Sequence, residues 1–183
     1  MTQPQTETPA TAPASPSVFL IGCMGAGKST VGRQLARRLS RVFYDTDKVI
    51  EERTGTNIAR IFEIEGEPGF RDREARVIVE LAALPMIVLA TGGGAVLRAD
   101  NRQVLADHGL VVYLYATLGQ LVERTRYDKT RPLLQTDKPE AVLERLLEER
   151  DPLYRDTAHL IVPTAHRTVR QIIDRICTEL GIT

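Results

Sequence analysis

A glycine-rich loop near the N-terminus constrains the fold of this chain more than any other feature. Residues 22–30 read Gly-Cys-Met-Gly-Ala-Gly-Lys-Ser-Thr, which is the G-x-x-x-x-G-K-[ST] pattern of a phosphate-binding loop. Its glycines let backbone N–H groups turn inward around phosphate oxygens, while Lys28 can reach the outer phosphates and the Ser29 hydroxyl can ligate Mg²⁺. Such a loop works between a buried strand and a helix N-terminus, whose dipole adds positive potential.

The sequence on both sides of the loop has that order. Val18 to Ile21 form a short apolar run, as a buried strand requires. Val31, Leu35 and Leu39 recur at every fourth residue, as on one face of a helix. We therefore interpret the motif as a nucleotide-binding loop and not as a chance glycine-rich turn.

Apolar runs and helical patterns alternate along the rest of the chain. Further strands are predicted at residues 42–44, 86–90, 111–115 and 160–162. Helices are predicted from Glu67 to Leu84 before Pro85, from Pro139 to about Glu149, and after Thr168, which forms a capping-box pattern with Gln171. The alternation predicts an α/β domain with a parallel sheet between helices, and ligands at the carboxyl ends of the strands.

The composition limits the classes of partner and the compartment. Lys and Arg total 24, as do Asp and Glu, so no net field attracts the chain to nucleic acid or to a membrane. No apolar stretch is as long as a membrane span, and Cys23 and Cys177 do not make a disulfide framework, so we expect a cytoplasmic protein with free thiols. Residues 1–16 contain one charged side chain, that of Glu7, and are predicted to be a disordered tail before a single domain at 17–183.

Two acids follow the second predicted strand, in the triplet Asp45-Thr46-Asp47. Their place just past a strand end directs both toward the crevice that holds the phosphate loop. One carboxylate near Ser29 can hold Mg²⁺ through a water, and the other can bind a substrate hydroxyl and accept its proton. The alternative is a helix N-cap, a role that Asp47 or Thr46 would also satisfy.

Arg71 opens a predicted helix and has two interpretations. It can form a fork on a substrate carboxylate, or it can pair with Asp72 or Glu74 on a solvated surface, and periodicity alone favours the surface pair. Three consecutive glycines, 92–94, follow the third strand. Their cost in backbone entropy predicts a close approach of the backbone to a ligand.

Two segments near the end of the chain carry further arginines. The segment from Arg124 to Leu134 is basic and then apolar, and it lies between two predicted helices. Such a segment is typical of a mobile lid that brings an arginine to the transferring phosphoryl group, although an ordinary exposed loop can have the same composition. Pro152 is expected to end the next helix, where Arg150 can cap the helix carbonyls or face the ligand.

Together these motifs resemble the shikimate kinase family. The resemblance is carried by the phosphate loop, the Asp-Thr-Asp triplet, Ile50-Glu51-Glu52-Arg53-Thr54-Gly55, Ile61-Phe62, Gly66-Glu67, Phe70-Arg71, the three glycines, Arg131-Pro132-Leu133-Leu134, and Arg150 with Pro152-Leu153-Tyr154. It implies a P-loop fold of the nucleoside-monophosphate-kinase type, in three α/β/α layers with a five-stranded parallel sheet and a lid at about 124–136. It also implies a monomer that phosphorylates the 3-hydroxyl of shikimate with ATP and Mg²⁺ in aromatic amino-acid biosynthesis.

The resemblance assigns roles to single residues. On the nucleotide side, it implies that the ATP phosphates contact Gly25, Ala26, Gly27, Lys28, Ser29, Thr30 and the lid residue Arg131, that Arg124 and Arg167 lie near the adenine, and that Ser29 and Asp45 serve Mg²⁺. On the acceptor side, it implies that Asp47 binds hydroxyls and is the candidate base, that Arg71 and Arg150 hold the carboxylate, and that Gly93 gives a backbone contact. Lys28, Asp47 and Arg131 are the expected catalytic residues.

Other functions remain compatible with a phosphate loop. Another small-metabolite kinase, such as a gluconate kinase, would share the loop but not the combination of the acidic triplet with the arginine pair. A GTPase-type switch would need an Asn-Lys-x-Asp motif, which the sequence lacks. A catalytically inactive binding module is disfavoured, because every catalytic position of the family pattern is filled.

Overall fold

A five-stranded parallel sheet forms the centre of the molecule. The computed structural model describes residues 16–126, 136 and 138–182. The strands are β1 (Ser17–Ile21), β2 (Val42–Asp45), β3 (Ile87–Ala90), β4 (Gly109–Tyr115) and β5 (Leu160–Pro163). Their order across the sheet is β2-β3-β1-β4-β5, and every neighbouring pair is parallel. Because β1 is the central strand, the phosphate loop that follows it lies at the middle of the carboxyl edge.

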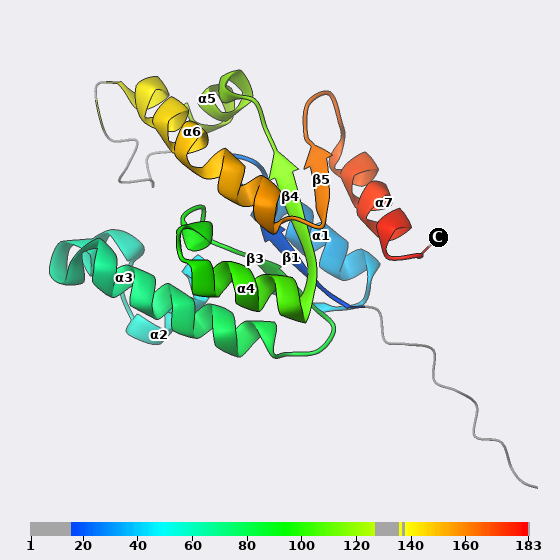
Figure 1. Ribbon diagram of the computed structural model, residues 1–183, viewed down its shortest axis with the longest axis horizontal. Helices are drawn as coiled ribbons and strands as arrows, with labels where there is room; N and C mark the ends of the chain where they lie inside the picture. The colour runs from blue at the N-terminus through cyan, green and yellow to red at the C-terminus, as the bar shows by residue number, and fades with distance from the viewer. Residues whose placement is uncertain (1–15, 127–135, 137, 183) are drawn as a thin grey trace, which may run out of the picture.

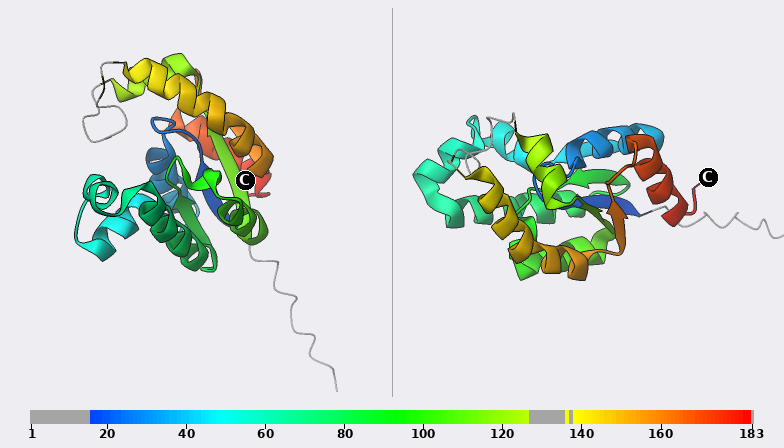
Figure 2. Two further views of the ribbon diagram at one scale, coloured as in Figure 1. Left: turned by 60° about the vertical axis from the view of Figure 1, so that its left-hand side comes forward. Right: turned by 90° about the horizontal axis from the view of Figure 1, so that it is seen from above.

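Helices cover both faces of this sheet. They are α1 (Lys28–Arg38), α2 (Thr46–Thr54), α3 (Ile58–Ala82), the 3₁₀ helix η1 (Ala95–Leu97), α4 (Ala99–His108), α5 (Leu118–Thr125), α6 (Pro139–Thr157) and α7 (Val169–Glu179). Seen from above, α1 and α7 lie on one side of the sheet, and α4 and α6 lie on the other (Figure 2). Figure 1 shows α2 and α3 side by side, away from the pair formed by α5 and α6. This three-layer arrangement confirms the predicted fold class.

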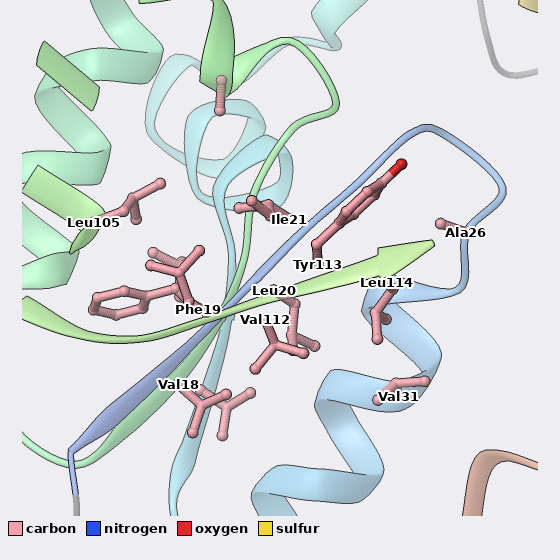
Figure 3. Packing of buried hydrophobic residues seen from close by; sticks show 14 of the residues in the cluster. Val18, Phe19, Leu20, Ile21, Ala26, Val31, Leu105, Val112, Tyr113 and Leu114 are labelled. Atoms are coloured by element: carbon pink, nitrogen blue, oxygen red, sulfur yellow. The ribbon is translucent and has the colours of Figure 1, made fainter. Parts of the chain in front are cut away.

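The core surrounds the central strand on both faces. Figure 3 shows Phe19 and Leu20 of β1 packed with Val112 of β4, while Leu105 and Val31 approach from helices on opposite sides. These three strand side chains are completely buried because helices cover both faces of the sheet at its centre. Each such side chain contributes about 1.5–3 kcal/mol on burial, so β1 is a firm base for the loop that follows it.

The helix predicted from Glu67 to Leu84 begins earlier than expected. α3 starts at Ile58 and contains one non-helical residue, Gly66, with φ 69° and ψ −179°. A positive φ is readily available to glycine, so the chain kinks there and resumes the helix at Pro68, which suits a first helical turn. The sequence prediction found only the second half of this kinked helix.

The prediction that Pro152 ends a helix is wrong. α6 continues to Thr157 with Pro152 inside it. An internal proline removes one helical hydrogen bond and costs about 3 kcal/mol. Arg150 and Tyr154 on either side of Pro152 are buried at 5% and 0% exposure, and this packing outweighs the lost bond.

Two predicted segments lie mostly outside the described residues. Of the N-terminal tail only Pro16 is described, and residues 127–135 of the predicted lid are not, so Arg131 falls outside the described residues. In the described part of the chain, no helix combines the length and the apolar character needed to cross a membrane.

Candidate active site

Glycines with positive φ shape the phosphate loop between β1 and α1. Gly25 has φ 79° and Gly27 has φ 96°, a region that other residues rarely adopt. Gly27 is the N-cap of α1, and the N–H of Ala26 donates to the carbonyl of Cys23 at 3.2 Å within the turn. The first N–H groups of α1, at 28–30, have no acceptor inside the helix, so this end of α1 offers donors to an anion.

The side chain of Lys28 folds back over the loop. Its Nζ donates to the carbonyl oxygens of Gly22 at 2.7 Å and Cys23 at 3.0 Å. Both acceptors are neutral carbonyls, and an anionic phosphate oxygen is a stronger partner for an ammonium group. The structure thus keeps a positive charge beside the backbone donors of the loop.

Asp45 links the phosphate loop to the start of α2. The Ser29 hydroxyl donates to Asp45 Oδ2 at 2.6 Å, and the backbone N–H of Asp47 donates to Asp45 Oδ1 at 3.2 Å. The helix N-cap is therefore Asp45, and the alternative that Asp47 or Thr46 caps this helix is wrong. Because Asp45 takes over capping, the side chain of Asp47 is not used for it.

A hydroxyl and a carboxylate at the loop fit Mg²⁺ in ligand chemistry. Mg²⁺ takes one or two protein carboxylates and keeps several waters, and Ser29 with Asp45 offers such a minimal set. Among the described residues, no group of three or more His, Cys, Asp or Glu side chains could hold a metal ion. A cation bound at this point of the described chain would accordingly rely on water and phosphate oxygens for its other ligands.

The glycines 92–94 make room for side chains from α2 and α3. A Cβ on Gly92 would collide with Glu74 Oε1 and would lie 2.9 Å from Asp47 Oδ1, and a Cβ on Gly94 would collide with the Arg71 guanidinium. Gly92 is also tied to α2, because its N–H donates to the buried hydroxyl of Thr46 at 2.9 Å. The packing of these side chains therefore requires glycine at positions 92 and 94. This is a second reason for the glycines, besides the predicted close approach of a ligand.

Arg71 lies in a partly enclosed ion-pair network and not on a solvated surface. Its side chain is 13% exposed and pairs with Glu74 at 2.7 Å, whose side chain is 0% exposed, and with Glu67 at 3.0 Å. Burial alone would lower the pKa of Arg71, but Glu74 and Glu67 outweigh burial and raise it. The surface-pair interpretation was right about Glu74 as a partner of Arg71 but wrong about the solvated surface. Its other suggested partner, Asp72, pairs with Arg98 instead.

Glu74 is the main residue at this site for which sequence reasoning offered only a surface role. Its Oε1 is buried and has no hydrogen-bond partner among the described residues. Burial raises the pKa of its carboxyl, Arg71 and Arg150 oppose the rise, and Asp47 adds to it. A buried acid between two arginines and a second acid is typical of a functional site. The only sequence signal was its spacing of three residues from Arg71.

Arg150 faces the glycines from the middle of α6. It is 5% exposed, its Nε has no hydrogen-bond partner among the described residues, and its Nη1 is 3.8 Å from the place of a Gly93 Cβ. The alternative that Arg150 caps the carbonyls at the end of the helix is wrong, since α6 continues for seven more residues to Thr157. We call Asp47, Arg71, Glu74 and Arg150, with glycines 92–94, the charged cluster.

Tyr154 also reaches the charged cluster. Its hydroxyl donates to the carbonyl oxygen of Gly93. Tyr154 and Arg150 are four residues apart on α6 and so share one face of the helix. No local pattern distinguishes this tyrosine from an ordinary core aromatic, which explains why sequence reasoning did not assign it to the site.

Of the remaining predicted residues, Arg124 contacts the phosphate loop. Arg124 donates to the Thr164 hydroxyl at 3.1 Å and to the Gly25 carbonyl at 3.4 Å, so it connects α5, the phosphate loop and the segment after β5. Arg167 is exposed on that same segment, and Thr30 is exposed on the first turn of α1. The structure thus brings Arg124 to the loop, whereas the side chain of Arg167 is exposed to solvent.

The charged cluster lies directly against the phosphate loop. A Cβ on Gly93 would be 3.5 Å from the backbone N of Met24 and 3.7 Å from the carbonyl oxygen of Gly22. An anion-binding loop is therefore adjacent to two arginines and two acids. Such a pair of regions can hold a nucleotide phosphate on one side and an anionic molecule with hydroxyl groups on the other.

Known sequences resemble this chain over most of its length. The sequence model of the shikimate kinase family matches residues 24–181. A shikimate kinase of Burkholderia thailandensis is 56% identical over 164 residues, which cover 90% of this chain and 89% of that protein. A shikimate kinase of Chromobacterium violaceum is 56% identical over 162 residues, covering 88% of each protein.

Solved structures resemble the fold in the same way. A shikimate kinase from Acinetobacter baumannii in complex with shikimate is 49% identical, with a TM-score of 0.88 over 91% of this chain and 93% of that chain. A shikimate kinase from Aquifex aeolicus is 33% identical, with a TM-score of 0.78 over 90% of this chain and 96% of that chain. A gluconokinase from Sinorhizobium meliloti, at 18% identity and a TM-score of 0.58 over 91% of this chain and 92% of that chain, shares the fold alone.

Proposed function

This chain belongs to the shikimate kinase family, and we propose that it transfers the γ-phosphoryl group of ATP to the 3-hydroxyl of shikimate. The products are shikimate 3-phosphate and ADP, and the reaction belongs to the chorismate and aromatic amino-acid pathway. The observation that carries the proposal is the contact between the phosphate loop and a cluster holding two arginines and two acids. We expect the enzyme to work as a cytoplasmic monomer, and its two buried free cysteines support a reducing compartment.

The phosphate loop is proposed to bind the nucleotide. The N–H groups of residues 25–30 would surround the phosphates, and Lys28 would exchange its carbonyl acceptors for phosphate oxygens. Ser29 and Asp45 would hold Mg²⁺, which neutralises charge on the phosphates when bound. Arg131 is proposed to add a positive charge, and Arg124, with Arg167 farther out, to border the adenine.

The charged cluster is proposed to bind the acceptor. Arg71 and Arg150 would hold its carboxylate, and the half-buried Gly93 would offer backbone contact between them. Glu74 would keep Arg71 in place, since the two side chains are paired out of solvent. Asp47, whose Oδ1 lies beside Gly92 and whose side chain does not cap the helix, would bind the reacting hydroxyl.

Phosphoryl transfer then depends on position and charge more than on covalent chemistry by the protein. The acceptor oxygen forms a bond to the γ-phosphorus, and the bond from that phosphorus to the β–γ bridging oxygen breaks. The reacting hydroxyl donates a hydrogen bond to Asp47, whose carboxylate orients it and can take its proton as the new bond forms. Lys28 would stabilise the negative charge that develops on the leaving phosphate.

A substrate panel tests this proposal. Purified protein with Mg·ATP should release ADP strongly when shikimate is present, and only weakly with gluconate, with quinate or with no acceptor. Stimulation by gluconate instead would assign the chain to another small-metabolite kinase activity. If no acceptor stimulated ADP release, the roles proposed for Asp47, Arg71 and Arg150 would lose their basis.

A further inference from the structure

The three glycines of the charged cluster are anchored unequally. The carbonyls of Gly92 and Gly94 accept hydrogen bonds from Ala95 and Leu97 at 3.1 and 3.0 Å, within the local turn that leads into η1. The carbonyl of Gly93 accepts its bond from Tyr154, which is 61 residues away in sequence. Consecutive glycines lose more conformational freedom on folding than other residues, so the middle one depends on an anchor from outside the turn.

Tyr154 belongs to a stacked pair of tyrosines whose hydroxyl groups have different partners. Its ring stacks on Tyr113 of β4, with ring centroids 4.9 Å apart and an interplanar angle of 29°. The Tyr113 hydroxyl donates to Asp151 Oδ1 at 2.7 Å, and Asp151 is held in turn by Arg155 at 2.6 Å. In Figure 3 the Tyr113 hydroxyl points away from the packed side chains of the core. One hydroxyl of the pair thus reaches the charged cluster, and the other does not.

We propose that Tyr154 is a positioning residue that sets the separation between Arg150 and the Gly93 backbone, and so the fit of the acceptor carboxylate. The inference rests on the proposed function. Arg150 and Tyr154 share one face of α6, so the bond from Tyr154 to Gly93 fixes how deeply that face approaches the glycines. It also fixes the plane of the peptide between Gly93 and Gly94, because a peptide is planar.

The surroundings of Tyr154 suit this role. Its side chain is 0% exposed, and burial raises the pKa of its hydroxyl, so the group stays protonated and can donate. The Nε of Arg150 has no hydrogen-bond partner among the described residues, and its guanidinium interacts with Tyr154 one turn along the same helix. Moving α6 slightly would therefore move the guanidinium relative to Gly93.

The test compares two single hydroxyl deletions in the same stacked pair, Tyr154→Phe and Tyr113→Phe. Steady-state kinetics with varied shikimate and varied ATP should show the shikimate KM raised about three- to tenfold in Tyr154→Phe, as the loss of one buried hydrogen bond predicts. Its kcat should change less than twofold, and its ATP KM should be unchanged. Tyr113→Phe should keep both KM values, because its hydroxyl bonds Asp151 outside the charged cluster.

Hydrogen exchange of the peptide spanning 91–97 gives a readout that is independent of turnover. Tyr154→Phe should speed exchange there relative to wild type and Tyr113→Phe, with thermal unfolding confirming that both variants are folded. Equal shikimate KM values in wild type and Tyr154→Phe would overturn the inference, as would equal KM changes in the two variants. If shikimate did not stimulate ADP release by the wild-type protein, the proposed function would be overturned instead. The exchange result would still decide whether Tyr154 anchors Gly93.

Discussion

The phosphate loop and the charged cluster are built in different ways. The loop is one run of nine residues, 22–30, whose shape comes from backbone conformation at glycines and from the start of α1. The charged cluster takes its members from α2, α3, the turn after β3 and α6, which are far apart in sequence. Its shape comes from side-chain ion pairs and from the space that Gly92 and Gly94 leave.

This difference predicts two kinds of mutational effect. A change in the loop acts on the phosphates, which every phosphoryl transfer requires, so it should reduce turnover with any acceptor. A change in the charged cluster acts on one ligand, so it should mainly alter the use of shikimate. Kinetics that separate kcat, the shikimate KM and the ATP KM therefore test whether the two regions differ in this way.

The largest effect is expected for Lys28→Met. Removing the ammonium from the loop should lower kcat about 10³-fold, because the charge that develops on the transferring group loses a preorganised partner. The matched control is Lys48→Met, because the side chain of Lys48 is 66% exposed and its ammonium pairs with Glu51. Near-normal kcat in Lys28→Met, measured by coupled ADP release, would contradict the assignment of the loop.

Asp47→Asn should have the next largest effect. Loss of the carboxylate should lower kcat about 10²-fold, since the amide that replaces it can accept a hydrogen bond from the reacting hydroxyl but cannot take its proton. ATP binding measured by calorimetry should be retained, because Asp47 lies in the charged cluster and the capping acid Asp45 is untouched. A variant that lost ATP binding while keeping normal turnover at saturating ATP would place Asp47 on the nucleotide side instead.

Arg71→Lys should mainly weaken acceptor binding. A point charge replaces a planar fork, so the shikimate KM should rise about tenfold while the ATP KM stays constant. Arg73→Lys is the control, because Arg73 is two residues away on the same helix and pairs with Glu65 at a side-chain exposure of 42%. If the two variants had the same shikimate KM, Arg71 would be a structural ion-pair residue only.

The sequence predicted the local parts of this molecule well. The loop, the five strands and the capping box of Thr168 with Gln171 all depend on neighbours in sequence, and all are present in the structure. The prediction that Pro152 ends a helix failed because packing around Arg150 and Tyr154 outweighs a local preference. Predictions from neighbouring residues therefore succeed where no long-range packing opposes the local preference.

The charged cluster was predictable only in part. Asp47 and Arg71 follow recognisable motifs, whereas the burial of Glu74 and the bond from Tyr154 to Gly93 arise when α3 and α6 pack on the glycine turn. A glutamate three residues after an arginine is usually a solvated pair, and nothing in the sequence marks this one as buried. Long-range packing determines these roles, and a single sequence does not contain it.

The smallest effect is expected in the pH dependence of stability. Two acids on α3 should differ in it, the buried Glu74 of the charged cluster and the exposed Glu65. The pKa of Glu74 is raised from 4.5, so the folded state holds this proton more tightly than the unfolded chain. The contribution of Glu74 to the free energy of unfolding should therefore fall as pH rises above about 4.5, by up to about 1.4 kcal/mol per pH unit until its folded pKa is passed.

Urea unfolding of wild type, Glu74→Gln and Glu65→Gln between pH 3 and pH 8 measures this contrast. Relative to Glu74→Gln, wild type should lose stability as pH rises above the ordinary glutamate value, because the variant has no proton to release there. A hydrogen bond from Arg73 lowers the pKa of the exposed Glu65, so its pH dependence has the opposite sign. The contribution of Glu65 to the free energy of unfolding is complete above the ordinary glutamate pKa and is lost as the pH falls through the lowered pKa. Parallel curves for wild type and Glu74→Gln across the whole range would mean that Glu74 titrates normally, and the charged cluster would then be as open to water as the helix surface.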